Sequence, residues 1–96
     1  MRFLGICGLF KQTIDGKEEI EVGYRINDEF WGKGYGTEAA AGCIGYAKNK
    51  LGLSSVISLI LKENRQSIRV AEKNGLTLEK ETIFKGKVHQ VYRIRF

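Results

Sequence analysis

The chain of 96 residues contains no proline, one histidine and two cysteines, and these scarcities exclude several kinds of protein. A structural zinc site usually needs four ligands, and Cys7 and Cys43 show neither a Cys-x-x-Cys spacing nor histidines at ligand spacing. We therefore expect no metal centre. We expect both cysteines to be small core thiols of a protein from the reducing cytoplasm.

Long apolar segments are also missing. No run approaches the roughly 18 apolar residues of a membrane span, and the N-terminal stretch "MRFLGICGLF" lacks a cleavage signal. No internal repeat, low-complexity stretch or linker divides the sequence. We expect a single cytoplasmic domain over residues 1–96 that makes no membrane contact.

The charge balance is basic, with 16 lysines and arginines against 11 acidic residues and a net charge of +5. Such an excess favours an anionic partner. The basic residues form no long block and are not interleaved with aromatic residues, as they would be on a sheet that stacks nucleotides. A nucleic-acid-binding module is therefore disfavoured, whereas a small polyphosphate fits the same charge.

Hydrophobic periodicity predicts seven regular elements. The apolar run at 2–10 predicts a strand with Gly5 and Gly8 as candidate bulge points, and Asp15-Gly16 signals a hairpin turn before an alternating strand at 19–26. The elements that follow are a helix ended by Gly52, a strand at 54–61 with both faces apolar, a helix at 65–73 capped by Asn64 and ended by Asn74-Gly75, and two antiparallel strands around Lys85-Gly86-Lys87.

The order β-β-α-β-α-β-β predicts an α/β (α+β) fold. The sheet is expected to be mixed and mostly antiparallel, with one parallel pair formed by the strands at 19–26 and 54–61. The helix between these two strands should form a right-handed crossover.

The stretch "FWGKGYGTEA" lies between the strand at 19–26 and the first helix, and it places Gly32, Gly34 and Gly36 at alternate positions. A glycine-rich turn before a helix lets successive backbone N–H groups converge on one anion, beside the positive end of the helix dipole. A phosphate or pyrophosphate is the best-matched ligand, and Lys33 adds a positive charge. A tight turn without a ligand is the alternative. The spacing fits neither the P-loop nor the dinucleotide-binding fingerprint.

These residues resemble the acetyl-coenzyme A loop of the GNAT superfamily of N-acetyltransferases. The family loop reads Gln/Arg-x-x-Gly-x-Gly/Ala, and Trp31, Gly34 and Gly36 hold its three defining places here. The stretch "WGKGYGTEA" resembles the branch of ribosomal-protein alanine N-acetyltransferases, as does "NRQSIRVAEKNGL", with Leu76 in a phenylalanine place. The resemblance runs from about Phe3 to the C-terminus and implies a partial GNAT fold whose central parallel strands splay apart.

The resemblance also implies that acetyl-coenzyme A (acetyl-CoA) is the co-substrate. Its pantetheine arm would pair with the backbone of Tyr24, Arg25 and Ile26, and Asn64 would combine a coenzyme contact with its role as helix cap. The residues expected to hold the pyrophosphate are Gly32, Lys33, Gly34, Tyr35, Gly36 and Thr37. Those expected near the adenosine 3′-phosphate, unless they are merely exposed, are Arg65, Arg69 and Lys73.

Two residues are the candidates for catalysis. In the resembling branch a serine in the place of Ser67 lies near the thioester sulfur, where it can protonate the departing thiolate or donate a hydrogen bond to it, and the alternative here is a capping-turn serine. Many family members use a tyrosine one turn later, where this chain has Ala71. Glu21 is the candidate base for the acceptor amine, unless it is a solvated edge charge. The residues expected to have structural or surface roles are Glu38, Glu72 and His89.

The implied activity is acetyl transfer to a primary amine by direct attack in a ternary complex. The acceptor would be a protein N-terminus, a polyamine or another small amine. Family domains are about half again as long, and the first strand, two helices and a further strand have no counterpart before Phe3. A non-catalytic CoA-binding remnant, or a fragment completed by a partner, is the alternative. With one sheet face uncovered, we expect an exposed patch of Ile and Leu and self-association into a homo-oligomer.

Overall fold

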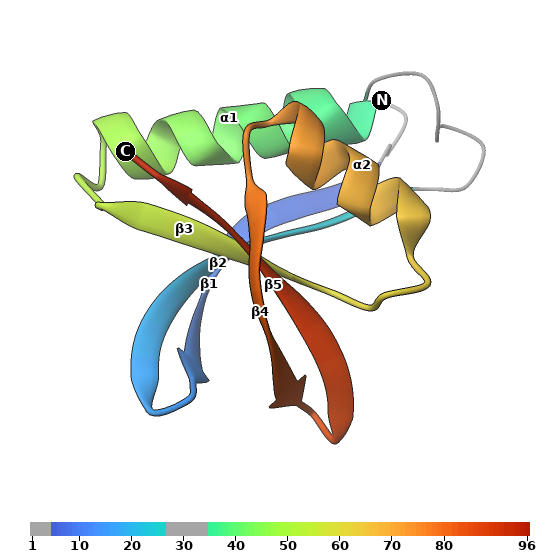
Figure 1. Ribbon diagram of the computed structural model, residues 1–96. Coiled ribbons are helices and arrows are strands. Elements are labelled where there is room, and N and C mark those ends of the chain that lie inside the picture. Colours follow the sequence, from blue (N-terminus) through green and yellow to red (C-terminus); the bar gives the residue numbers. More distant parts are fainter. Residues whose placement is uncertain (1–4, 27–34) are drawn as a thin grey trace.

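The computed structural model describes residues 5–26 and 35–96, and the side chains of residues 8–23 and 37–96. Its elements follow the predicted order (Figure 1). The strands are β1 (Gly5–Ile14), β2 (Lys17–Ile26), β3 (Ser55–Ile60), β4 (Thr77–Phe84) and β5 (Lys87–Arg95), and the helices are α1 (Tyr35–Asn49) and α2 (Arg65–Lys73). Neither of these two described helices has the length and apolarity needed to cross a membrane.

The five strands form one mixed sheet in the order β1-β2-β3-β5-β4. Strands β2 and β3 run parallel and the other neighbouring strands pair antiparallel, so the predicted α+β architecture is confirmed. Both helices lie on the same side of the sheet (Figure 1). We call that side the helix face and the other side the open face.

Two tight turns set the register of the outer hairpins. At Asp15-Gly16 and Lys85-Gly86 all four φ angles are positive, between 51° and 83°. This is the type I′ geometry, which matches the twist of the flanking strands and favours glycine at the second place. Both turns lie where the sequence predicts them. The predicted helix stops at Gly52 and Gly75 are also confirmed by positive φ values of 66° and 87°.

The glycines of the first hairpin provide room for an aromatic ring. Strand β1 pairs with β2 in one continuous register along its whole length, so the bulges predicted at Gly5 and Gly8 are wrong. Gly8 lies opposite Gly23, and the ring of Phe10 lies against both residues. A Cβ at Gly23 would lie 2.9 Å from Phe10 Cε2, closer than packed atoms tolerate.

The main core lies between the helix face and the two helices. Alternation along the strands directs Val22 of β2 and Val56 of β3 toward this core, and Ile44 comes from α1. Leu76 closes back onto the end of α2, as predicted, with its N–H donating to the Ala71 carbonyl at 3.0 Å. The buried residues of the cluster are Val22, Ile44, Ala47, Val56, Ile60, Ala71, Leu76 and Tyr92.

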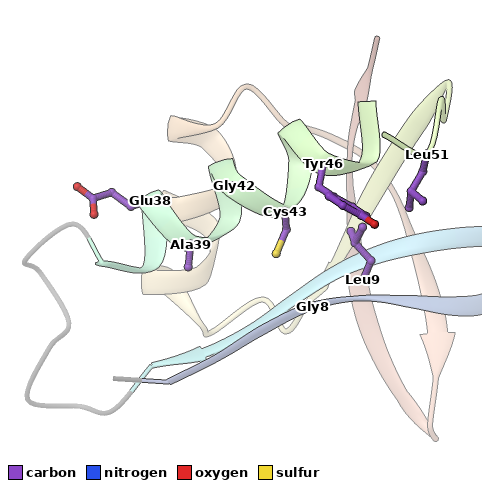
Figure 2. A pocket seen from close by; sticks show the side chains of 8 residues that line it. All are labelled: Gly8, Leu9, Glu38, Ala39, Gly42, Cys43, Tyr46 and Leu51. Carbon is purple, nitrogen blue, oxygen red and sulfur yellow. The ribbon is translucent and has the colours of Figure 1, made fainter. Parts of the chain in front are cut away.

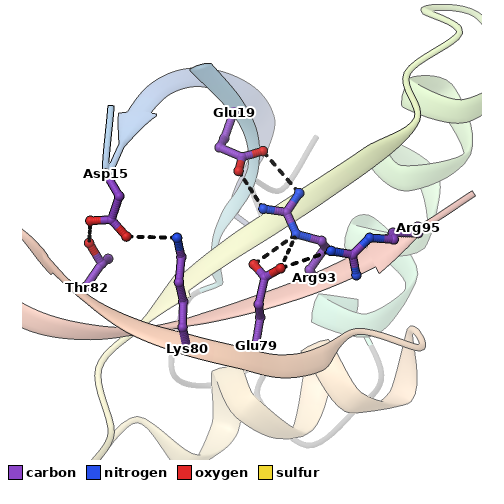
Figure 3. A network of polar contacts seen from close by, with 7 residues as sticks. All are labelled: Asp15, Glu19, Glu79, Lys80, Thr82, Arg93 and Arg95. Atoms are coloured by element: carbon purple, nitrogen blue, oxygen red, sulfur yellow. Dashed lines mark hydrogen bonds and ion pairs between the residues drawn. The ribbon is translucent and has the colours of Figure 1, made fainter. Parts of the chain in front are cut away.

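The open face is closed by the curvature of the sheet itself. Its buried cluster consists of Ile14, Ile57 and Val91. The two edge strands meet over this cluster, because Asp15 at the end of β1 accepts from Thr82 Oγ1 of β4 at 2.8 Å and lies 2.8 Å from Lys80 Nζ (Figure 3). Ile57 and Val91 are 0% exposed. The large exposed patch of Ile and Leu predicted for this face is therefore wrong for the described residues.

A largely buried arginine side chain joins four strands on the open face. The side chain of Arg93 in β5 is 10% exposed and donates to both carboxylate oxygens of Glu19 in β2 (Figure 3). It also donates to both oxygens of Glu79 in β4 and, at 2.7 Å, to Ser55 Oγ in β3. These contacts, with the hydrogen bonds to Glu19 the largest cause, raise the pKa of Arg93. We call Arg93, Glu19 and Glu79 the arginine bridge.

A β-bulge in β4 explains how neighbouring residues both serve this face. The register shifts between Leu78 and Lys80, so Glu79 and Lys80 lie on the same side of the sheet (Figure 3). Burial alone would raise the pKa of Glu79, but hydrogen bonds from Arg93 and Arg95 outweigh it and lower the pKa. A hydrogen bond from Lys80 likewise lowers the pKa of Asp15.

Candidate functional site

The parallel pairing of β2 with β3 is minimal. Among the described residues, the two strands share one registered pair, Glu21 opposite Ile57. Toward the carboxyl ends of both strands, Ser58 Oγ then donates to the Val22 carbonyl at 3.1 Å, and within residues 5–26 and 35–96 no further registered pair of these strands follows. We call the facing edges beyond this bond, residues 24–26 of β2 and 59–60 of β3, the strand fork.

Alternation fixes which backbone groups face the strand fork. The Val22 carbonyl points toward β3, since Ser58 binds it, and successive residues of a strand direct their backbone groups to opposite edges. The N–H and C=O of Tyr24 therefore face β3, whereas those of Arg25 face β1, where Arg25 lies opposite Ile6. Open sheets commonly bind ligands at such carboxyl ends of parallel strands.

Ser58 is the residue of this region that sequence reasoning missed. It is 2% exposed and lies on the helix face of β3, between the core residues Val56 and Ile60. The signal in the sequence is a single hydroxyl in the otherwise apolar run "VISLIL". A buried hydroxyl needs a hydrogen-bond partner, and Ser58 has found one on the neighbouring strand.

The predicted pyrophosphate loop is only partly within the described residues. Tyr35, Gly36 and Thr37 form the start of α1, with Glu38 in its first turn, where a carboxylate stabilises the helix dipole. The Thr37 carbonyl accepts from Asn74 Nδ2 at 3.2 Å, which ties the start of α1 to the end of α2. The predicted site residues that lie outside the described residues are Gly32, Lys33 and Gly34.

The first turn of α2 contains two predicted site residues. Asn64 caps the helix as predicted, with Oδ1 accepting from the Ser67 N–H at 3.2 Å. Ser67 is half-buried and lies one turn before Val70 and Ala71, so it shares their inward side of the helix. Ala71, in the place of the family tyrosine, is 2% exposed and belongs to the main core.

A row of positive charge follows the outer side of α2. Arg65, Arg69 and Lys73 are four residues apart and exposed, so they lie in line along the helix. Within the described part of the chain, the salt bridges involve other residues, and these three side chains have no acidic partner. The row is therefore free to interact with an anion.

Glu21, the predicted base, lies on the open face. It is half-buried, and its Oε1 accepts from Gln12 Nε2 at 2.9 Å. Ser67 belongs to a helix on the other face, so the two predicted catalytic residues lie on opposite sides of the sheet. His89 is engaged locally, with Nδ1 3.0 Å from the Lys87 carbonyl and its ring edge-on to Phe84.

A separate groove of about 560 Å³ lies between α1 and β1 (Figure 2). Its lining residues are Gly8, Leu9, Glu38, Ala39, Gly42, Cys43, Tyr46 and Leu51. Tyr46 and Leu51 are 54% and 49% exposed, and Cys43 also packs against the main core, as predicted. Among the described residues, none of the predicted coenzyme residues lines this groove. No cluster of three His, Cys, Asp or Glu side chains that could hold a metal occurs among the described residues.

Comparisons with known proteins agree with this architecture. The sequence profile of the acetyltransferase (GNAT) domain matches residues 1–77. The chain is 41% identical over 78 residues to the uncharacterized protein YkkB of Bacillus subtilis. This alignment covers 81% of this chain and 45% of that protein. The chain is also 39% identical over 67 residues to the FsC-acetyl coenzyme A-N(2)-transacetylase of Aspergillus fumigatus, covering 70% of this chain and 28% of that protein.

A solved structure has the same fold. The acetyltransferase from Agrobacterium tumefaciens superposes with a TM-score of 0.82 at 29% identity, over 97% of this chain and 53% of that chain. The chain therefore belongs to the GNAT family of acetyltransferases. It spans about half the length of YkkB and of the Agrobacterium protein, and less of the fungal enzyme.

Proposed function

We propose that the chain binds acetyl-CoA and transfers its acetyl group to a primary amine. The observation that carries this proposal is the strand fork, where two parallel strands share one registered pair and Tyr24 directs its backbone groups to an edge that no described strand pairs with. The amides of a pantetheine arm suit such an edge, because they can add to it as an extra strand does. The name of the fungal relative, which includes acetyl coenzyme A, supports this chemistry.

The charges near α2 fit the nucleotide half of CoA. The row of Arg65, Arg69 and Lys73, which has no acidic partner among the described residues, would bind the 3′-phosphate, since three cations in line attract a dianion. Asn64 uses Oδ1 as the helix cap, so its carboxamide nitrogen can donate to the coenzyme. The groups proposed to hold the pyrophosphate are the backbone amides of Gly32, Lys33, Gly34, Tyr35 and Gly36 and the hydroxyl of Thr37.

Acetyl transfer would proceed in a ternary complex. Glu21 on the open face would accept a proton from the protonated form of the amine, directly or through a water, so that the neutral amine nitrogen can attack the thioester carbonyl. Backbone N–H groups would stabilise the tetrahedral oxyanion, and its collapse would break the C–S bond. Ser67 would donate its hydroxyl proton to the departing thiolate from the helix face and would regain a proton from water. Coenzyme and acceptor would thus approach the sheet from opposite sides.

A thiol-release assay tests this proposal. We expect free CoA to appear when the chain is incubated with acetyl-CoA and an amine, and Ser67→Ala or Glu21→Gln to lower kcat by about 10² or more, as for other acid–base groups. Glu18→Gln on the same strand, whose carboxylate pairs with Lys11, is the matched control and should keep full turnover. Full turnover in Ser67→Ala would remove its role as acid. CoA binding without any thiol release would favour the non-catalytic remnant.

The acceptor proposal rests on the branch motif "WGKGYGTEA", whose resemblance favours a protein N-terminal amine or a small amine, and of these we propose the N-terminal amine. A polyamine or another small amine is the alternative. The same assay with an alanine-initiated peptide, spermidine and an aminoglycoside separates these substrates. The largest kcat/KM should occur with the peptide, and a preference for spermidine would contradict the proposed N-terminal acceptor.

We infer that the chain is one domain over 1–96 that pairs with a second copy through the groove between α1 and β1. A Cβ at Gly42 would meet nothing within 4 Å, and Tyr46 beside it is 54% exposed. An antiparallel pair of α1 helices would place Tyr46 of each copy over Gly42 of the other. Light scattering after size exclusion should give twice the chain mass, and Tyr46→Lys should give the monomer. A wild-type monomer at tens of micromolar would contradict this pairing.

A further inference from the structure

Ser58 forms an unusual link at the strand fork. Its hydroxyl is the polar group of a side chain that is 2% exposed, with the core residues Val56 and Ile60 two positions away on either side. The hydroxyl donates across to β2, to the Val22 carbonyl, at 3.1 Å. In a parallel ladder a carbonyl in this place accepts from a backbone N–H of the next strand.

The side-chain bond therefore replaces the next rung of the ladder. The Val22 carbonyl is satisfied without a backbone amide of β3, so the two strands can separate at this point without leaving a buried acceptor unpaired. Without the hydroxyl, the carbonyl would be satisfied only if the strands moved closer and extended their pairing. An unsatisfied Val22 carbonyl and a closer approach of the strands would each change the backbone edge that Tyr24 presents to β3.

We propose that Ser58 is a positioning residue that keeps the strand fork open for the pantetheine arm of CoA. The inference rests on the proposed function, because it assigns the fork to that ligand. Ser58 itself is buried on the helix face of β3, and it acts through its hydrogen bond to the Val22 carbonyl and the separation of the strands. Its effect should therefore fall on the pantetheine half of the coenzyme and leave the nucleotide half unaffected.

The test compares two ligands by titration calorimetry on the full chain: CoA, and adenosine 3′,5′-bisphosphate, which has no pantetheine. We expect Ser58→Ala to weaken CoA binding by about tenfold, the effect of one lost hydrogen bond, and to change the affinity for the bisphosphate by less than about twofold. Ser58→Thr, which keeps the hydroxyl, should restore CoA affinity. Ser55→Ala is the matched control on the same strand, since its hydroxyl serves Arg93, and it should leave both affinities unchanged.

Three results would overturn the inference. One is an unchanged CoA affinity in Ser58→Ala, and another is an equal loss for both ligands, which would indicate a structural role alone. If Ser58→Ala does not fold, Ser58→Cys keeps the volume with a weaker donor, and it should show the same selective loss. The third is failure of the unsubstituted chain to bind CoA, which would overturn the proposed function as well. Binding of CoA by the wild type with no effect of Ser58 would overturn the inference only.

Discussion

At the residue scale, single polar side chains form hydrogen bonds with backbone groups at the ends of helices and between strands. Asn64 supplies an acceptor to the first turn of α2, and Ser58 supplies a donor to β2. The first could be predicted, because a helix cap is read from a local pattern of residues. The second could not, since a hydroxyl in an apolar strand gives no sign of which carbonyl on another strand it will meet.

The two roles of Asn64 can be separated by substitution. Asn64→Ala removes the cap and should lower the free energy of unfolding by about 1 kcal/mol, measured by urea denaturation. Asn64→Ser keeps a capping oxygen but removes the carboxamide nitrogen, so it should preserve stability and still weaken CoA binding. Equal CoA affinity in Asn64→Ser and the wild type would limit Asn64 to capping.

At the scale of the elements, turn and cap residues are the most informative part of the sequence. The Asp-Gly and Lys-Gly turns and the stops at Gly52 and Gly75 are all confirmed, because each depends on the local backbone conformation alone. Strand β1 continues to Ile14 instead of ending at residue 10, because pairing with β2 holds its polar second half in the sheet. The bulge in β4 was not predicted, since it depends on contacts with distant residues such as Arg93.

Replacing a glycine with alanine should have opposite effects on the free energy of unfolding in α1 and in β2. A Cβ at Gly45 in α1 meets nothing within 4 Å, so Gly45→Ala should raise the free energy of unfolding by about 1 kcal/mol through helix propensity. A Cβ at Gly23 in β2 would collide with the ring of Phe10, so Gly23→Ala should lower it by about 1–3 kcal/mol. Thermal unfolding of both variants measures the difference, and a stabilising Gly23→Ala would show that the ring moves freely.

At the scale of the whole molecule, the sheet covers its own open face. Asp15 meets Lys80 and Thr82 across the two edge strands, and the arginine bridge joins β2, β5 and β4 (Figure 3). The expectation of an exposed apolar patch failed because the sequence shows alternation along each strand but not the twist of the assembled sheet. The GNAT fold itself could be recognised, since its glycine loop and second motif are short local patterns that follow each other in a fixed order along the sequence.

The arginine bridge predicts a pH dependence of stability. The folded-state pKa of Glu79 is lowered, so its contribution is fully present above the unfolded value of about 4.3 and is lost as pH falls through the folded value. At neutral pH, Glu79→Gln should lower the free energy of unfolding by about 1 kcal/mol. As the pH falls below the unfolded value, the difference between the variant and the wild type should narrow. Urea midpoints measured across this range test the prediction, and a difference that grows in acid would contradict it.

The most direct test of the proposed coenzyme site is a titration of the isotope-labelled chain with CoA, followed by the backbone amide signals in NMR spectra. If the strand fork and the start of α1 hold the coenzyme, the amides of Tyr24, Thr37 and Asn64 should shift on binding. Those of the hairpin turns at Gly16 and Gly86 should not. Shifts confined to the groove residues Gly8, Cys43 and Tyr46, or no shifts at saturating CoA, would contradict the proposed site.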